Sequence, residues 1–302
     1  MPRMATGPLP PLEGSNAMAL RINYNFESVS AQRNLSGTQH SFFRAIEQLS
    51  SGLRINKAAD DAAGLAVSEK LKNQVRGINQ AQRNAQDAVS LLQTAEGALN
   101  ETHNILARMR ELAVQSSNDT LTNADRLHIQ DEVNQLLSEV DRIAAATQFN
   151  TITLLNGGGQ STGLQFHVGP NNVTTASVDE ITFGLTSAST SGLTITSLGT
   201  TGAQSLTTQS GANAAISVLD SAIESVSTRR GSIGAMQNRL QSTISSLGVA
   251  SENTGAANSR IRDADVAQAV SEMVKNQILQ QSTMAVLAQA NQAPQMALQL
   301  LK

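Results

Sequence analysis

Residues 71–113 read LKNQVRGINQAQRNAQDAVSLLQTAEGALNETHNILARMRELA, and this stretch decides the fold. Every seventh residue in it is apolar: Leu71, Ile78, Ala85, Leu92, Leu99, Leu106 and Ala113. A repeat of seven is typical of a long α-helix that buries one seam against another helix. Glu96, His103 and Arg110 occupy companion positions in the second half, so we expect a helix of roughly fifty residues whose seam becomes more polar.

Two further segments repeat the pattern. After the turn-rich SSNDTLTNAD, where Asn123 or Asp125 is the expected cap, apolar residues return at Ile129, Val133, Leu136, Val140 and Ile143. From Ala214 the seam resumes at Ile216, Leu219, Ile223, Val226, Ile233, Leu240, Ile244 and Leu247. The chain is free of proline from Leu12 to Gly169, and the loop between the first two seams is short. The sequence predicts a mainly α fold: a long antiparallel helical bundle or coiled coil formed by the N- and C-terminal segments.

The middle of the chain has a different texture. Gly, Thr, Ser and Asn dominate from about Phe149 to Gly211. Short alternating pieces, LQFHV, ITFGL and LTITSL, are typical of strands. About sixty residues form too small a region for a large domain, so we expect a small β-hairpin region beside the helices.

The two chain ends look unable to stand alone in water. The segment Asp263–Lys302 holds eight Gln, few charges and apolar residues spread around the helix. We expect it to be disordered or loosely helical in the monomer and to become ordered when buried with other chains; Met18–Ser51 raises the same expectation. The residues expected to drive polymerisation are Leu35, Phe42, Ile46, Leu49, Val270, Met273, Ile278, Leu287, Leu298 and Leu301.

Residues 49–66, LSSGLRINKAADDAAGLA, concentrate charge beside a glycine, and helix signals explain them better than a ligand loop. Gly52 suits the end of one helix and Asn56 the cap of the next. Asp60 and Asp61 would then lie in the first turns, near the positive end of the helix dipole. We predict a joint between two helices.

Composition excludes several classes of function. The net charge of −3 removes a basic nucleic-acid footprint, and zero Cys removes disulfides and thiolate metal sites. No run approaches the ~20 apolar residues of a membrane span. The four histidines are scattered, and adjacent aspartates on a helix point about 100° apart, so neither a metal site nor an acid–base pair is indicated. We expect no cofactor and no enzymatic activity.

Several segments, in order, resemble bacterial flagellin. They are LSSGLRINKAADDAAGLAVSEKL, LLQTAEGALNETHNIL, RELAVQSSN, TQFNTITLLNG and, at the other end, SRIRDADVAQAV with the residues that follow it. FHVGPNNVTTASVDEI resembles the hairpin region of the family's inner domain. The resemblance covers Met18 to about Gly157 and Ala212–Lys302. Since the outer variable domains are nearly absent, the chain resembles a minimal flagellin.

The resemblance implies a domain plan and a set of partners. It implies a homopolymeric helical filament, a chaperone at the C-terminal segment, cap and junction proteins, and secretion through the flagellar type III apparatus to the extracellular flagellum. It further implies recognition by the vertebrate Toll-like receptor that senses flagellin. The expected parts are a disordered extension or cloning remnant at 1–17, an inner-domain helix at 18–58, rod-domain helices at 59–156, a β/turn region at 157–211, a rod-domain helix at 212–262 and an inner-domain helix at 263–302. The receptor contacts implied by the family are Arg108, Leu112, Gln115 and Glu132.

Pairing of the two ends predicts a specific neighbourhood. RIN at 54–56 and RIRDAD at 260–265 should mark one level of the rod. Arg54 should then lie near Asp263 or Asp265. Asp60 or Asp61 should lie near Arg260 or Arg262. Such exposed ion pairs are worth only ~0.2–1 kcal/mol, so they would mark the register more than stabilise it.

The sequence thus favours a structural subunit of a flagellar filament. The nearest alternative is a hook–filament junction protein of the same system, and an exported helical adhesin is an alternative from another class. RELAVQ, TQFN and ANQAPQMALQLL favour the filament subunit.

Overall fold

The computed structural model describes residues 24–157, 163–171, 179–199, 202 and 204–300. Of residues 293–300 it describes the backbone alone. The expected extension at 1–17 and the predicted site residue Leu301 lie outside the described residues. The chain divides into two compact units, one made of Met1–Ala66 with Ser259–Lys302 and the other of Val67–Asn258.

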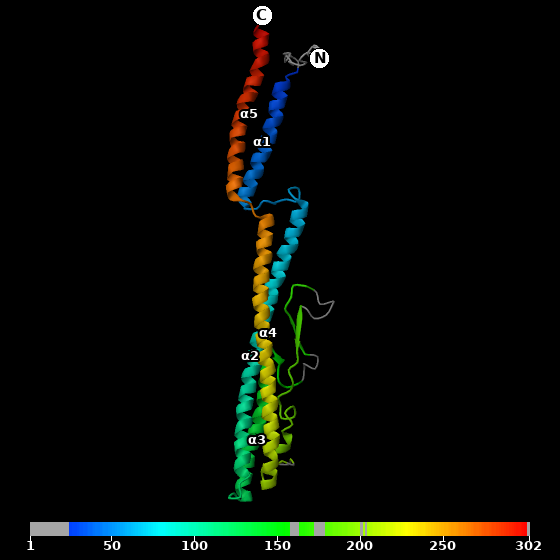
Figure 1. Ribbon diagram of the computed structural model, residues 1–302, viewed down its shortest axis with the longest axis vertical. Helices are drawn as coiled ribbons and strands as arrows, with labels where there is room; N and C mark the ends of the chain where they lie inside the picture. Colours follow the sequence, from blue (N-terminus) through cyan, green and yellow to red (C-terminus); the bar gives the residue numbers. More distant parts are fainter. Residues whose placement is uncertain (1–23, 158–162, 172–178, 200–201, 203, 301–302) are drawn as a thin grey trace, which may run out of the picture. The chain divides into compact units, whose positions relative to one another are not determined.

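Long helices dominate the described residues, which confirms the predicted mainly α fold (Figure 1). They are α1 Phe26–Ser51, α2 Ala62–Ser116, α3 Asn123–Ala146, α4 Gln209–Arg262 and α5 Val266–Leu300. At 55 residues α2 has the length that the repeat of seven predicts. The cap of α3 differs from both predicted positions: Thr122 is the N-cap, and Asp125 completes a capping box with it.

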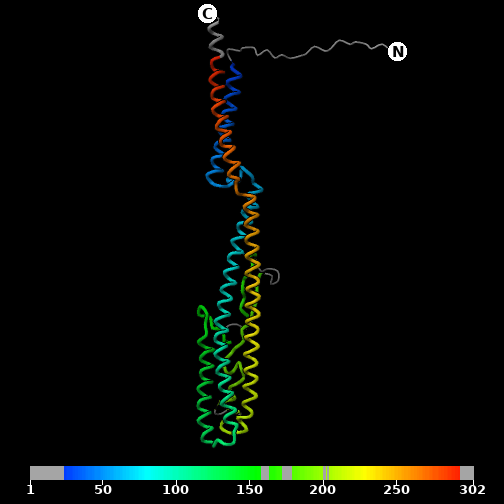
Figure 2. Tube along the Cα trace, turned by 60° about the vertical axis from the view of Figure 1, so that its left-hand side comes forward, coloured from blue at the N-terminus to red at the C-terminus, as the bar shows by residue number. Residues whose placement is uncertain are grey.

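In the first unit, α1 and α5 run side by side in opposite directions (Figures 1 and 2). At one end the Asn25 side chain donates a hydrogen bond to the Ala290 carbonyl at 2.8 Å. At the other end Leu53 forms an antiparallel bridge with Asp263. The C-terminal segment is therefore a continuous helix in this structure rather than disordered or loosely helical, and α1 supplies a partner for it as far as Ala290 and Asn291.

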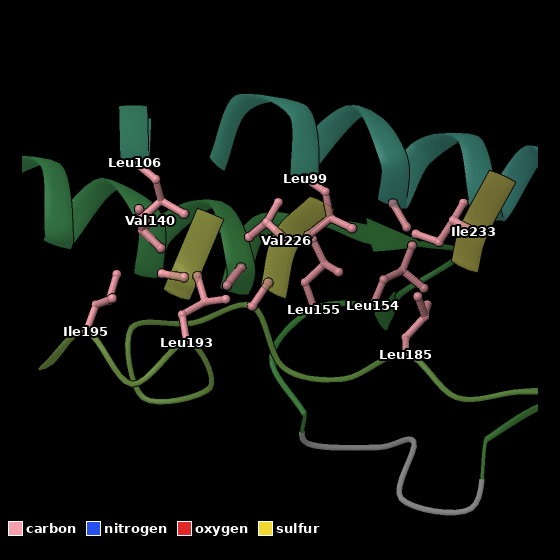
Figure 3. Packing of buried hydrophobic residues seen from close by; sticks show 14 of the residues in the cluster. Leu99, Leu106, Val140, Leu154, Leu155, Leu185, Leu193, Ile195, Val226 and Ile233 are labelled. Carbon is pink, nitrogen blue, oxygen red and sulfur yellow. The ribbon is translucent and has the colours of Figure 1, made fainter. Parts of the chain in front are cut away.

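In the second unit, α2, α3 and α4 enclose one apolar core with the segments that follow α3 (Figure 3). Leu99 and Leu106 come from α2, Val140 from α3, and Val226 from α4. The middle region adds Leu154, Leu155, Leu185, Leu193 and Ile195 to the same cluster. The middle region is thus part of the core of the bundle and not an outer decoration.

Two short antiparallel hairpins form in the middle region. β1 (Gln148–Phe149) pairs with β2 (Ile152–Thr153), and β3 (Leu164–His167) pairs with β4 (Glu180–Phe183). LQFHV and most of ITFGL are therefore strands as predicted. LTITSL is not, because Leu193 and Ile195 point into the core and the chain turns there into a 3₁₀ helix, η1, at Thr196–Leu198.

Candidate functional site

The seam between α1 and α5 follows a strict three–four spacing on both helices. The half-buried or buried residues at this spacing are Ser28, Ala31, Leu35, Thr38, Phe42, Ala45 and Leu49 on α1, and Ala269, Met273, Asn276, Gln280, Thr283, Leu287 and Ala290 on α5; Ser30, Gln39, Glu47 and Gln48 of α1 are also half-buried but lie outside this row. This is the spacing of a two-stranded coiled coil. Many of these residues are small or polar, so the seam buries little aliphatic surface for its length.

The predicted polymerisation residues fall into two groups in the structure. Five lie in the seam within the chain: Leu35, Phe42, Leu49, Met273 and Leu287. Ile46, Val270 and Ile278 are exposed. The Leu298 side chain lies outside the described set, as does Leu301. The first five thus help to hold α1 to α5, and the exposed group faces away from this seam; the role of all of them in polymerisation stays a prediction.

Sequence reasoning missed most of the exposed apolar surface on this pair. The missed residues are Tyr24, Phe26, Val29 and Phe43 on the α1 side, and Val266, Val274, Leu279, Met284 and Val286 on α5. Phe43 is 64% exposed although its ring lies 6.2 Å from that of Phe42. For six of them the available signal was that each directly follows or precedes a seam residue: Val29, Phe43, Val274, Leu279, Met284 and Val286. Exposed aliphatic and aromatic residues gathered in this way indicate an interaction surface.

The joint begins at Gly52, which ends α1 in the left-handed conformation with φ of 69°. Its amide donates to the Gln48 carbonyl at 2.9 Å, and its own carbonyl accepts from the Ala264 amide at 2.9 Å. A residue with a Cβ is strained at such a φ, so the glycine fits the position. Gly52 therefore both stops α1 and fastens it to the segment that precedes α5.

Arg54 meets the SRIRDAD segment through carbonyl groups and not through aspartates. Its amide donates to the Arg262 carbonyl at 2.7 Å, and its guanidinium donates to the Ile261 carbonyl. The expected ion pair with Asp263 or Asp265 is therefore wrong in its chemistry although right in its neighbourhood. The physical reason is that the last carbonyls of α4 lack helical partners, so they accept hydrogen bonds from a nearby cation.

Asp60 holds the loop closed against α1 rather than against α4. Its carboxylate accepts from the amides of Asn56 at 3.2 Å and Lys57 at 3.0 Å, and it forms an ion pair with Arg44 at 3.2 Å. The predicted pairing with Arg260 or Arg262, which lie in the last turn of α4, is replaced by Arg44. The backbone hydrogen bond from Lys57, with the charge of Arg44 as a smaller cause, lowers the pKa of Asp60.

The remaining joint residues act as local caps. The Asp61 side chain accepts from the Gly64 amide at 2.9 Å, so Asp61 and not Asn56 caps α2. The Asn56 side chain instead donates to the Ser51 hydroxyl at 2.8 Å. Asp263 accepts from the Ser259 hydroxyl at 2.6 Å, and Asp265 accepts from the amide of Ala267 in the first turn of α5.

The residues implied as receptor contacts are brought together only in part. Arg108 on α2 pairs with Glu132 on α3 at 3.0 Å, and both are exposed. Gln115 is exposed on the same helix as Arg108. Leu112 is 2% exposed and belongs to the core. Its side chain therefore does not share the surface that the other three residues form.

Over the described residues, the side chains that commonly bind metals do not gather in groups of three or more. Among the helices of that same part of the chain, we find none with the length and apolar character that crossing a bilayer requires. The fold and its exposed surface define an α-helical protein that presents apolar residues on a pair of helices made from its two chain ends.

Comparisons with known proteins agree with this class. Residues 22–160 match the family described as bacterial flagellin N-terminal helical region, and residues 216–301 match bacterial flagellin C-terminal helical region. A flagellin of Halalkalibacterium halodurans is 47% identical over 281 residues, which cover 93% of this chain and 99% of that protein. The flagellar filament 33 kDa core protein of Treponema phagedenis is 45% identical over 290 residues, which cover 93% and 99%.

A solved structure described as a flagellar hook-associated protein from Vibrio parahaemolyticus has a TM-score of 0.53 at 17% identity, covering 68% of this chain and 100% of that one. At that identity the likeness concerns the fold alone. The chain belongs to the bacterial flagellin family, and this family consists of structural proteins and not of enzymes.

Proposed function

We propose that the chain is the structural subunit of a bacterial flagellar filament and that it polymerises through the exposed apolar residues of α1 and α5. The observation that carries the proposal is the distribution of apolar side chains on this pair. Many residues of its seam are small or polar, while Phe43, Val274 and Leu279 lie on its outer surface.

Burial of these exposed apolar side chains against a partner would lower the free energy. Full burial of one Val, Leu, Ile or Phe side chain contributes about 1.5–3 kcal/mol. We infer that the partner is another copy of the same chain, because a relative that this chain matches over 99% of its length is named a flagellar filament core protein. Seeded polymerisation of the purified full chain, followed by electron microscopy, tests the proposal directly.

A truncation gives a sharper test. Removal of Asp263–Lys302 deletes α5 and removes no residue from the second unit, Val67–Asn258. We expect the truncated chain to remain soluble and helical and to form no filaments with seeds. Filaments formed by it would overturn the mechanism. Abundance of the full chain in sheared filaments separates a filament subunit from the junction protein, which would occur only at the filament base.

The domain plan and the export route belong to the same proposal. Residues 18–58 and 263–302 would form the channel-lining part, 59–156 and 212–262 the rod, and 157–211 its β/turn region. An export chaperone would cover the C-terminal segment before assembly, since its apolar residues are exposed there. The chain would then leave through the type III apparatus and meet the cap and junction proteins outside the cell. Co-purification with a chaperone that is lost on removal of 263–302 would support this order of events.

A second role, recognition of the monomer by the flagellin-sensing Toll-like receptor, is favoured by the exposed Arg108–Glu132 pair. Leu112 lies on α2 with its side chain buried in the core, so it would act there by packing and not by touching the receptor. We expect Arg108→Glu to abolish receptor signalling by folded monomer. The matched control is Arg142→Glu, which changes another exposed, ion-paired arginine on α3. A wild-type monomer that gives no signal would refute this role.

A further inference from the structure

Most of the exposed apolar residues beside the seam of α1 and α5 fall on two sides of the pair; Ile278, two positions from the nearest seam residues, belongs to neither side. Six of these residues directly follow a seam residue: Val29, Phe43, Ile46, Val270, Val274 and Met284. The four of these nearest the joint, Phe43, Ile46, Val270 and Val274, form patch A. Two others directly precede a seam residue and form patch B: Leu279 and Val286. Because successive helical residues are about 100° apart, followers and predecessors of the seam point to opposite sides.

Antiparallel pairing makes patch A continuous across both helices. In two helices that run in opposite directions, the residues that follow the seam lie on the same side of the pair. Leu53 is bridged to Asp263 at one end of the pair, and the Asn25 side chain reaches Ala290 at the other. Counting the same number of residues along the chain from Leu53 and from Asp263 into the two helices places Ile46 beside Val270. Patch A therefore covers the furrow between α1 and α5.

A groove of about 480 Å³ borders patch A at Phe43 and Ile46, and the rest of its lining comes from α1 and the loop that follows it, including Glu47, Ser50 and Lys57. Patch B has a different shape. Leu279 and Val286 are one heptad apart on a single helix, where Ile278, Met284 and Ala285 close to them are also exposed. Patch B lies along one helix, whereas patch A spans two helices, and the ridge of one helix packs naturally into the groove between two others.

We propose that patch A of one copy binds patch B of a second copy, an inference that rests on the proposed function and specifies its contact. The two patches differ and lie on opposite sides, so this contact is heterologous: each copy uses one side as acceptor and the other as donor. Heterologous contacts that do not close into a ring produce helical filaments. A two-fold contact of patch A with itself would instead end at a dimer and leave patch B in water.

Two matched variants test the arrangement in the full chain. Val270→Asp disables patch A and Val286→Asp disables patch B; both change an exposed valine of α5, 38% and 54% exposed respectively. A carboxylate in an apolar contact is strongly disfavoured, so each variant alone should need at least roughly tenfold more protein to polymerise. Leu127→Asp, an exposed apolar residue of α3, is the control for the same chemical change elsewhere.

Mixing the two variants distinguishes a heterologous contact from any other. Val270→Asp retains patch B and Val286→Asp retains patch A, so the mixture should form dimers in analytical ultracentrifugation but no filaments. A mixture that stays monomeric, or single variants that polymerise as readily as wild type, would overturn the inference. Wild-type protein that never polymerises would instead refute the proposed function.

Cross-linking provides a test that does not depend on the charged variants folding. The chain contains no cysteine, so Ile46→Cys and Leu279→Cys each introduce a single thiol. Under oxidation, filaments that contain both variants should yield a disulfide between Ile46→Cys and Leu279→Cys chains. Disulfides only between two Ile46→Cys chains would show that patch A meets itself and would contradict the proposal.

Discussion

The α1/α5 pair and the α2–α4 bundle use one spacing of seam residues with different chemistry. In the bundle, Leu92, Leu99 and Leu106 are at most 1% exposed. In the pair, the corresponding rows include Thr38, Asn276 and Gln280. Periodicity alone therefore does not report how strongly two helices are held together. The bundle buries its aliphatic residues within the chain, whereas the pair keeps many of its own on the outside, where a second copy could cover them.

Polar interruptions of the seams reinforce this difference. In the bundle, Glu96 accepts from Gln237 at 3.1 Å, and Arg110 pairs with Asp220 at 2.5 Å, so α2 and α4 satisfy each other's polar positions. These paired side chains fix the register between two helices that are distant in sequence. In the pair, hydrogen bonds that cross between the helices, such as Ser28 to Asn291, lie near one end.

The largest expected contrast is between two leucines truncated to alanine. Leu106→Ala opens a cavity in a fully buried site and should lower the free energy of unfolding by about 2–5 kcal/mol. Leu35→Ala removes a half-buried seam residue of α1 and should leave the unfolding of the bundle unchanged. Chemical denaturation of both variants, followed by circular dichroism, makes the comparison. Equal losses would mean that the two regions unfold as one.

A buried amide of the bundle gives the next effect. Gln130 donates to the Leu198 carbonyl at 2.8 Å and accepts from the Leu206 amide at 2.6 Å, which ties the segment before α4 to α3. Gln130→Leu leaves both backbone groups without this partner and should cost about 1–3 kcal/mol for each group that stays buried and unpaired. Gln135→Leu, an exposed change on the same helix, should alter unfolding by less than about 0.5 kcal/mol. Equal stability of the two variants would argue against this tie.

A helix cap gives a smaller effect within the bundle. The Thr122 hydroxyl accepts a hydrogen bond from the Asp125 amide, and the Asp125 carboxylate accepts one from the Thr122 amide at 3.0 Å. Thr122→Ala should cost about 1 kcal/mol, because it exposes orphan amides at the start of α3. Thr122→Ser restores the hydroxyl and should recover most of the loss in thermal unfolding. Failure of serine to rescue would assign the effect to the lost methyl group.

The smallest effect concerns pH and the loop after α1. Because hydrogen bonds in the folded state lower the pKa of Asp60 below its usual 3.8, its contribution is fully present above that value. The contribution is lost as pH falls through the lower, folded-state pKa. We expect the amide signals of Asn56 and Lys57 to shift in that acid range by NMR, with Asp60→Asn lacking the transition. A midpoint at or above 3.8 would contradict the predicted direction.

Helix signals in the sequence predicted the fold well where they concern one chain segment. The repeat of seven located α2, and Gly52 marked the end of α1, because helix period and left-handed backbone preference are local properties. Partners between distant segments were harder. Arg54 was placed beside the correct segment, but its bonding partners are carbonyls, since backbone groups carry no identity in a sequence. Asp60 pairs with Arg44 on the preceding helix, whereas the sequence predicted a partner at Arg260 or Arg262, about two hundred residues further along the chain.

The candidate surface shows the same limit in another form. Apolar spacing selected Leu35, Phe42 and Leu49 for contact between chains, yet spacing does not tell which helix covers a seam. By itself the sequence determined the helical class, the main helix positions, the joint at Gly52 and membership of the flagellin family. Only the tertiary structure decided which apolar residues hold the chain together and which stay exposed. The reason is physical: burial depends on what lies opposite a side chain, and antiparallel pairing of the two ends sets that neighbour.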